Sequence, residues 1–163
     1  MLKLMYITND PAVAKIAADA GVDRIFIDME VLGKAERQGG MDTVQSHHVP
    51  EDIAKVRAAI GDQAEIMARV NPLNPNSQTE IDDAIANGAD VIMLPMWRTA
   101  DDLRQLVSMV DSRAKVMPLL ETDTAADNLP EAVKVSGIDQ MLIGLNDLHL
   151  CYHQKFMFQL LAD

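Results

Sequence analysis

The sequence has little cysteine, little positive charge and no long apolar run. Its single cysteine excludes a disulfide framework and paired-cysteine zinc modules, and it is typical of a reducing compartment. The sequence contains 14 Lys and Arg and 25 Asp and Glu, which gives a net charge of -11. This charge argues against nucleic acid and anionic membranes as partners. No apolar run reaches the roughly 18–20 residues that span a bilayer, and the amino terminus lacks the apolar region of a signal peptide. We therefore expect a cytoplasmic protein that binds neither nucleic acid nor membrane.

Short apolar runs alternate with stretches of helical periodicity along the whole chain. The runs have the length of strands and little polar alternation, which indicates strands buried on both faces of a parallel sheet. They are Leu2–Ile7, Arg24–Met29, Ala64–Val70, Val91–Pro95, Lys115–Glu121 and Gln140–Leu145. A final helix is expected at Phe156–Leu161. The pattern predicts six βα units in one domain over residues 1–163.

Chemical signals mark the ends of the predicted helices. Capping residues are expected at Asp10 before Pro11 and in the pairs Ser77–Glu80 and Thr99–Asp102. A motif of glycine, any residue and aspartate recurs as Gly21-Val22-Asp23, Gly88-Ala89-Asp90 and Gly137-Ile138-Asp139. Each glycine can adopt the left-handed conformation that ends a helix, and a strand follows at once. The repetition indicates stacked βα units.

Six βα units are compatible with two architectures. One is an open doubly wound sheet, and the other is a TIM-type barrel that lacks its last two units, because eight units take about 250 residues. Polar residues follow almost every strand: Asp28 and Glu30, Arg69 and Asn71, Trp97 and Arg98, Glu121, and Asp147. In an open sheet only the strands at the switch point share a site. Contributions from five or six strands favour the α/β barrel, truncated to six units.

Two of these acids are candidates for a metal site. Glu121 and Asp147 would follow neighbouring strands and present only oxygen ligands, which suits Mg²⁺ or Mn²⁺. The alternative is structural, with Asp147 capping a helix and Glu121 in an ion pair. Spacing alone leaves both readings open.

Arg69 and a long loop supply the remaining candidates. Arg69 lies inside an apolar run, where it needs an anionic partner: a substrate carboxylate or enolate, or a salt bridge to Asp28, Glu30 or Glu121. The loop Val31–His48 is long enough to be a binding loop. It carries Arg37, His47 and His48, and either histidine is a candidate base or a surface residue without a role.

Five short motifs lie at the ends of the predicted strands. They are Asp28-Met29-Glu30, Ala68-Arg69-Val70-Asn71-Pro72, Gly88-Ala89-Asp90 leading to Leu94-Pro95, Leu119-Leu120-Glu121, and Ile143-Gly144-Leu145-Asn146-Asp147-Leu148. In this order they resemble the HpcH/HpaI aldolase and citrate lyase family of the phosphoenolpyruvate/pyruvate barrel superfamily. The resemblance covers essentially the whole chain.

The resemblance implies a metal-dependent carbon–carbon lyase. Residues matching Glu121 and Asp147 would hold the divalent metal, and the substrate would be a 2-oxo acid or an acyl thioester. Arg69 would contact the substrate and stabilise an enolate, and Glu30 would orient water at the site. We expect Asp28, Arg37 and Asn71 to complete substrate binding, and a homo-oligomer is expected from the family.

Two departures from the family pattern stand out. Family aldolases commonly carry a histidine directly after the strand-2 acid, where this chain has Val31, so the base is unassigned and His48 is a substitute. The last two barrel units are absent, which would expose two strand edges. The expectation is therefore a fragment of a longer product, and the rival function is an impaired, truncated barrel that acts as a binding or assembly partner.

Overall fold

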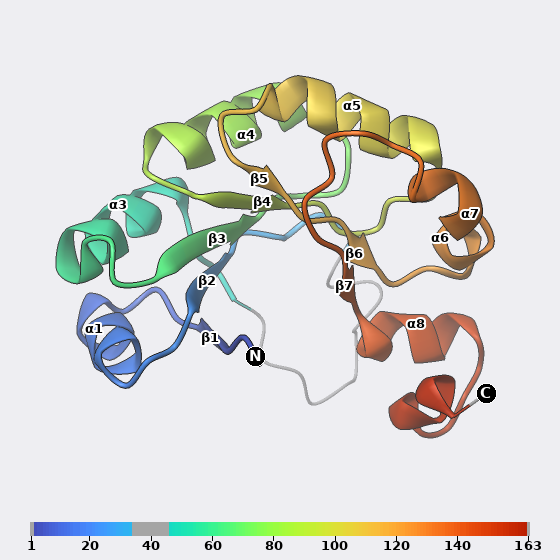
Figure 1. Ribbon diagram of the computed structural model, residues 1–163, viewed down its shortest axis with the longest axis horizontal. Coiled ribbons are helices and arrows are strands. Elements are labelled where there is room, and N and C mark those ends of the chain that lie inside the picture. Colours follow the sequence, from blue (N-terminus) through green and yellow to red (C-terminus); the bar gives the residue numbers. More distant parts are fainter. Residues whose placement is uncertain (1, 34–45, 163) are drawn as a thin grey trace.

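The computed structural model describes residues 2–33 and 46–162, and its centre is a parallel sheet (Figure 1). Five strands pair in the order in which they occur: β1 (Met5–Ile7), β2 (Arg24–Asp28), β3 (Glu65–Arg69), β4 (Val91–Met93) and β5 (Lys115–Val116). Two further segments, β6 (Leu119–Leu120) and β7 (Leu142–Ile143), also pair in parallel. The predicted α/β class with a parallel sheet is confirmed.

Hydrogen bonds join the two sheets into one arc. The amide of Leu119 donates to the carbonyl of Leu94, which carries the β4 pairing onward past β5. The amide of Leu142 donates to Pro118, on the other side of the same segment. The strand order never reverses, as it does at the switch point of a doubly wound sheet, so that alternative is disfavoured. Among the described strands, β1 and β7 do not pair, and no closed barrel is present.

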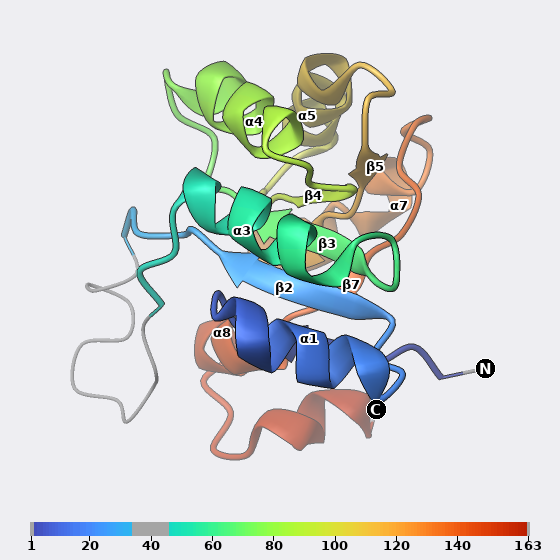
Figure 2. The ribbon, with the colours of Figure 1, turned by 90° about the vertical axis from the view of Figure 1, so that its left-hand side faces the viewer.

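The helices lie along the outer side of the arc, as Figures 1 and 2 show. They are α1 (Pro11–Asp19), α3 (Pro50–Ile60), α4 (Ser77–Ala86), α5 (Ala100–Val110), α6 (Asp123–Asp127), α7 (Leu129–Ala132) and α8 (Leu145–Cys151). Fully buried side chains of the strands, such as Ile25 and Ile66, pack there against helical residues such as Ile53 and Leu103. Each such burial contributes about 1.5–3 kcal/mol. None of the described helices has the length and apolar character needed to cross a membrane.

Several predicted boundaries differ from the observed ones. The expected strand Lys115–Glu121 is divided at Met117 and Pro118, where proline removes an amide donor. The expected strand Gln140–Leu145 is only Leu142–Ile143, because α8 begins at once with Leu145. The expected terminal helix is a short 3-10 segment, η1 (Met157–Leu161).

The helix caps are partly as predicted. Asp10 accepts hydrogen bonds from the amides of Ala12 and Val13, and Thr99 and Asp102 form a reciprocal capping box. The Ser77–Glu80 box is wrong. Asn76 is the N-cap of α4, and the Glu80 carboxylate instead accepts from the amide and side chain of Asn71.

The inner face of the sheet is layered. Alternate residues of a strand point to the same side, so each strand presents every second residue to the interior of the arc. From the amino to the carboxyl end these are Arg24, Phe26 and Asp28 on β2, and Glu65, Met67 and Arg69 on β3. An apolar middle layer that also includes Val91, Met93, Met117 and Leu119 separates two charged ends.

The recurring glycine motif fixes each strand to the one before it. The Asp23 carboxylate, just before β2, accepts the amide of Leu4 at 2.9 Å. Asp90 in the same way accepts the amide of Ile66 in β3 at 2.7 Å, and Asp139 accepts that of Val116 in β5 at 2.8 Å. The Asp23 carboxylate therefore satisfies a backbone donor just before β1, and the carboxylates of Asp90 and Asp139 satisfy donors within β3 and β5, which helps to fix the register.

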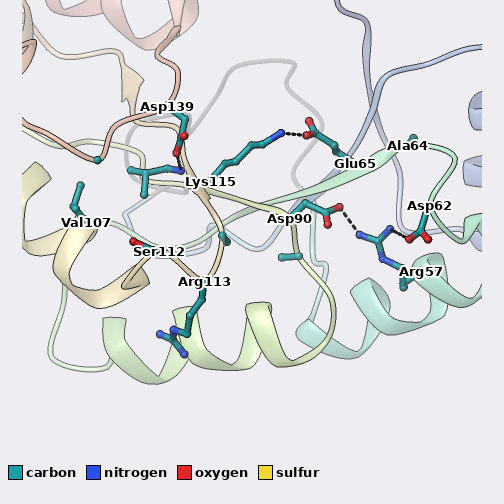
Figure 3. Close-up of a pocket in the computed structure, with 14 residues that line it drawn as sticks. Arg57, Asp62, Ala64, Glu65, Asp90, Val107, Ser112, Arg113, Lys115 and Asp139 are labelled. Carbon is teal, nitrogen blue, oxygen red and sulfur yellow. Dashed lines mark hydrogen bonds and ion pairs between the residues drawn. The ribbon is translucent and has the colours of Figure 1, made fainter.

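A hollow of about 580 Å³ at the amino-terminal ends of the strands is lined by paired charges (Figure 3). Arg57 pairs there with Asp90, and Lys115 with Glu65. Arg113 pairs with Asp82 of α4. Since these cations are already paired with carboxylates, we interpret the charges in this hollow as contributing to the fold and not to ligand binding.

Gly137 is tightly packed at this face, and its replacement by alanine is expected to destabilise the fold. A Cβ atom there would lie 2.6 Å from Cγ1 of Val107 in α5, and φ is +93°. Overpacking and left-handed strain together predict a loss of about 2–4 kcal/mol in the free energy of unfolding. Urea denaturation measures this loss.

Gly21→Ala is the matched control. Gly21 has a similar φ of +90°, but a Cβ there would meet nothing within 4 Å. Only the backbone strain of about 1–2 kcal/mol should remain. Equal losses in the two variants would show that the contact with Val107 relaxes freely.

Candidate active site

A cavity of about 490 Å³ opens at the carboxyl ends of the strands, opposite the hollow of Figure 3. Four predicted site residues line it together: Asp28 at the end of β2, Arg69 at the end of β3, Glu121 after β6, and Asp147 in α8. The apolar layer beneath, with Phe26, closes its floor. Residues separated by up to 119 positions therefore share one site.

Arg69 and Asp28 form a buried, two-point ion pair. The guanidinium donates through Nε to Oδ1 and through Nη2 to Oδ2 of Asp28, both at 2.8 Å. Burial lowers the pKa of Arg69, but the hydrogen bonds and charge of Asp28 outweigh burial and raise it above its ordinary value. The guanidinium also lies over the ring of Phe26, 5.5 Å from its centroid. Arg69 is thus a fixed positive charge at the centre of the site.

Glu30 stands beside this pair and is only 1% exposed. Its Oε2 lies 3.4 Å from Nε of Arg69. Its amide donates to Oδ1 of Asp28 at 3.3 Å. Arg69 also interacts electrostatically with Glu121, so one arginine compensates three carboxylates. Among the described residues, the site therefore carries more negative than positive charge.

Glu121 shows the effect of this surplus. It is 3% exposed, and burial raises the pKa of its carboxyl from 4.5 to about 7. The amide of Met96, which donates to Oε1 at 3.0 Å, and the positive charge of Arg69 lower the pKa of Glu121. The negative charges of Asp147 and Glu30 raise it further. The ionised form of a carboxyl group with a raised pKa is unfavourable, and a cation that enters the cavity would stabilise it.

Met96 reaches Glu121 because its backbone is strained. Its φ is +54°, a left-handed conformation that costs a non-glycine residue about 1–2 kcal/mol. This conformation aims the Met96 amide at the Glu121 carboxylate at the end of β4. Strain of this kind concentrates at functional sites.

The loop after β7 brings Asp147 into the site. Gly144 is the N-cap of α8, and Asp147 lies in the first turn, where it is buried. The helix N-terminus favours a negative charge there. Gly144 itself approaches Glu121 so closely that a Cβ would lie 2.9 Å from Cβ and 3.0 Å from Oε2 of Glu121.

The structure also places the remaining predicted residues. The amide of Asp28 donates to Nδ1 of His48 at 3.0 Å, so His48 adjoins the site. Asn71 accepts the amides of Val31 and Leu32 through Oδ1, both at 2.9 Å, and so holds the loop after β2. Arg37 lies outside the described residues. The roles assigned to these three residues stay predictions.

The oxygen donors of the cavity fit a hard divalent cation. Glu121 and Asp147 are two buried carboxylates that repel one another, and Mg²⁺ and Mn²⁺ favour such a pair, with water and substrate completing the coordination. Within residues 2–33 and 46–162, no group of three or more His, Cys, Asp or Glu side chains is arranged around a common metal position. Protein ligation by two residues, and not by a closed cage, is what the site offers.

Gly144→Ala tests whether this close approach positions Glu121. We expect a roughly 10- to 100-fold loss of Mn²⁺ affinity, because the methyl group would push the carboxylate out of place. The φ of Gly144 is -89°, so alanine adds no backbone strain. Calorimetric titration with Mn²⁺ measures the affinity, and thermal melting shows whether the variant folds. A folded variant with unchanged affinity would contradict the positioning role.

Met96 and Gly144 are the contributors that the strand-end pattern does not single out. Both act through the backbone, one by an amide and the other by the absence of a side chain, and a single sequence carries no chemical signal for either. The position of Gly144, three residues before Asp147 in the last of the five motifs, is the nearest indication.

The fold and site define a class: a sequentially wound parallel α/β protein with a carboxylate–arginine site at the carboxyl ends of its strands. The sequence model of HpcH/HpaI aldolase/citrate lyase matches residues 3–154. The chain therefore belongs to the HpcH/HpaI aldolase/citrate lyase family, whose members are aldolases and lyases. A comparison with curated protein sequences gives no match.

Solved structures show the same fold at low sequence identity. A family protein from Burkholderia cenocepacia J2315 is 18% identical with a TM-score of 0.74, over 95% of this chain and 68% of that one. Citrate synthase SbnG is 16% identical with a TM-score of 0.77, over 98% of this chain and 69% of that one. Macrophomate synthase is 14% identical with a TM-score of 0.67, over 94% of this chain and 58% of that one. The chain thus spans about three fifths to two thirds of the length of these proteins.

Proposed function

We propose that the protein is a divalent-metal-dependent carbon–carbon lyase acting on a 2-oxo acid or an acyl thioester. Glu121 and Asp147 would hold Mg²⁺ or Mn²⁺. The observation that carries the proposal is the burial of Glu121 beside Asp147 and Glu30, which raises the pKa of Glu121 to about 7. The family and the citrate synthase and macrophomate synthase folds support carbon–carbon chemistry.

The chain's own residues would stabilise charge on the substrate. Bond cleavage beside a carbonyl leaves an enolate, and the bound metal would supply Lewis-acid stabilisation of its oxygen. Arg69 bonds Asp28 through Nε and Nη2, which leaves Nη1 to donate to a substrate oxygen. Asp28 fixes the guanidinium plane, so this donor is oriented before substrate arrives. Glu30, buried beside Arg69, would orient a water molecule at the site.

The hydrogen bond between His48 and Asp28 bears on the role of the histidine. An amide can only donate, so Nδ1 of His48 accepts from Asp28 and the proton of the neutral imidazole is on Nε2. We propose His48 as a catalytic residue, because this bond places its ring beside the Asp28–Arg69 pair. Asn71 would place the loop that lies over the substrate, and Arg37 is proposed as a further substrate contact.

Pyruvate release from 4-hydroxy-2-oxo acids tests the function. We expect release that requires added Mg²⁺ or Mn²⁺ and that Glu121→Ala abolishes. Asp62→Ala, at a fully exposed aspartate of the opposite end, should retain the activity. Release that is indifferent to both the metal and Glu121 would remove the proposal.

The strand arc also supports a finer proposal about architecture. We propose that the arc is six βα units of a TIM-type barrel, in a cytoplasmic homo-oligomer. On β1, Tyr6 and Ile7 are 47% and 53% exposed, and Ile143 on β7 is 51% exposed, so apolar side chains line both open edges. Edges of this kind favour pairing with another surface.

These exposed edges favour the second candidate function, an impaired barrel that serves as a binding or assembly partner. Light scattering combined with metal calorimetry separates the two functions. Stable oligomers that bind neither Mg²⁺ nor Mn²⁺ would support the assembly role over the lyase.

A further inference from the structure

A second cavity, of about 550 Å³, lies beside the candidate active site. Its walls come from the loops that follow β2, β3 and β4, with Leu32, Leu73 and Trp97 among the lining residues. Met96 also lines it, and the amide of the same residue donates to Glu121. The two cavities share no lining residue, so this one is a separate space.

Trp97 contributes an unsatisfied hydrogen-bond donor to the lining. The residue is 2% exposed, and Nε1 is the one buried side-chain nitrogen or oxygen atom that has no partner in the described part of the chain. A buried indole N–H normally finds an acceptor, because an unpaired donor keeps its full desolvation cost. The structure therefore offers a donor for which residues 2–33 and 46–162 supply no acceptor.

Arg98 contributes an unpaired positive charge. Every other arginine among the described residues bonds a carboxylate: Arg24 with Glu65, Arg57 with Asp90, Arg69 with Asp28, Arg104 with Asp101, and Arg113 with Asp82. The Arg98 side chain has no such bond within residues 2–33 and 46–162, although the chain carries a net charge of -11. Arg98 is exposed and is one of the residues that line the cavity.

The acid in the lining does not neutralise Arg98. Oδ2 of Asp102 accepts the amides of Arg98 at 2.8 Å and Thr99 at 3.0 Å, at the start of α5. Backbone donors and the helix N-terminus thus compensate this carboxylate. The rest of the wall is largely apolar, with Leu32, Pro72 and Leu73.

We propose that this cavity is a binding site for an organic anion, namely a carboxylate carried on a short aliphatic body. The carboxylate would accept from Arg98 and, after a displacement of the buried Trp97 side chain, from Nε1 of Trp97, and the aliphatic part would contact the apolar wall. The site needs neither the metal nor turnover, so it stands apart from the proposed lyase function.

Trp97 is the single tryptophan of the chain and lines this cavity, so its fluorescence reports on binding there. The probes are hexanoate, hexanamide and hexylamine, which share an aliphatic body and differ in charge. We expect hexanoate to change the emission of Trp97 saturably and to bind at least about tenfold more tightly than the other two. Equal binding of the neutral amide, or tighter binding of the amine, would overturn the proposal.

Two variants locate the anion. Arg98→Ala is expected to weaken hexanoate binding about tenfold or more, whereas Arg104→Ala, within the following helix α5 and paired with Asp101, should leave it unchanged. Trp97→Phe keeps a ring in the wall and removes the N–H, and calorimetry should show weaker hexanoate binding. Hexanoate binding that survives Arg98→Ala unchanged would contradict the site.

Discussion

Replacement of Asp28 by asparagine is expected to lower the free energy of unfolding by about 3–5 kcal/mol. Asp28 is 2% exposed and holds both Nε and Nη2 of Arg69. The amide side chain would carry no charge and could accept only one of these two bonds, so the buried guanidinium would lose its direct two-point ion pair. Urea denaturation, with the midpoint and slope fitted together, measures the change.

Asp101→Asn is the matched control. Asp101 also pairs with an arginine, Arg104, but both side chains are exposed to solvent. A surface pair of this kind contributes at most about 1 kcal/mol. Losses of similar size in the two variants would show that the Asp28–Arg69 pair is no more important to the fold than a surface contact.

The second large effect is a dependence of stability on pH that comes from Glu121. Its folded pKa of about 7 is above its ordinary value of 4.5, so between these values the folded protein binds more protons than the unfolded chain. Stability contributed by protonated Glu121 is therefore present at low pH and is lost as the pH rises through about 7. The shift corresponds to a loss of about 3 kcal/mol in the metal-free protein.

Glu121→Gln should remove this dependence. The variant is expected to unfold with a flatter profile between pH 4.5 and 7.5 in the presence of a chelator, because other groups titrate alike in both proteins. Glu131→Gln, at an exposed glutamate paired with Lys134, is the control and should follow the wild type. Added Mn²⁺ should restore wild-type stability above pH 7 and leave Glu121→Gln unaffected. Coincident profiles for wild type and Glu121→Gln would contradict the pKa assignment.

Much of the fold could be predicted from the sequence because buried parallel strands are short and apolar. The runs at Arg24–Met29 and Ala64–Val70 coincide closely with β2 and β3. The boundaries were less predictable where local chemistry competed. Pro118 interrupts one run, and α8 begins so soon after β7 that its first residue was assigned to the strand.

The layered interior was a harder prediction. Asp28 was interpreted as a polar residue at a strand end, and Arg24 only as the first residue of an apolar run. In the structure they face the same side with Phe26 between them. Periodicity of two with charged ends is therefore the signal of the inner face, and it was present in the sequence.

In the candidate site, the side-chain features could be predicted from the sequence and the backbone features could not. Glu121 and Asp147 were predictable because acids at strand ends converge in a parallel fold, and they do line one cavity with Arg69. The ion pair of Arg69 with Asp28 was one of the alternatives that the sequence left open. The strained amide of Met96 and the close approach of Gly144 were not predictable, because each depends on distances that only the assembled fold defines.

The aspartates that precede β2, β4 and β7 also give the chain a direction of assembly. Each carboxylate accepts an amide from an earlier part of the chain, just before β1, in β3 or in β5. The backbone carbonyls of Asp23 and Asp90 instead accept the amides of Glu65 and Lys115 in later strands. The side-chain bond to each earlier segment can therefore form only when the next βα unit has been synthesised. Order would spread from the amino terminus toward the carboxyl terminus, and the newest strand would remain the least protected against exchange and misassembly.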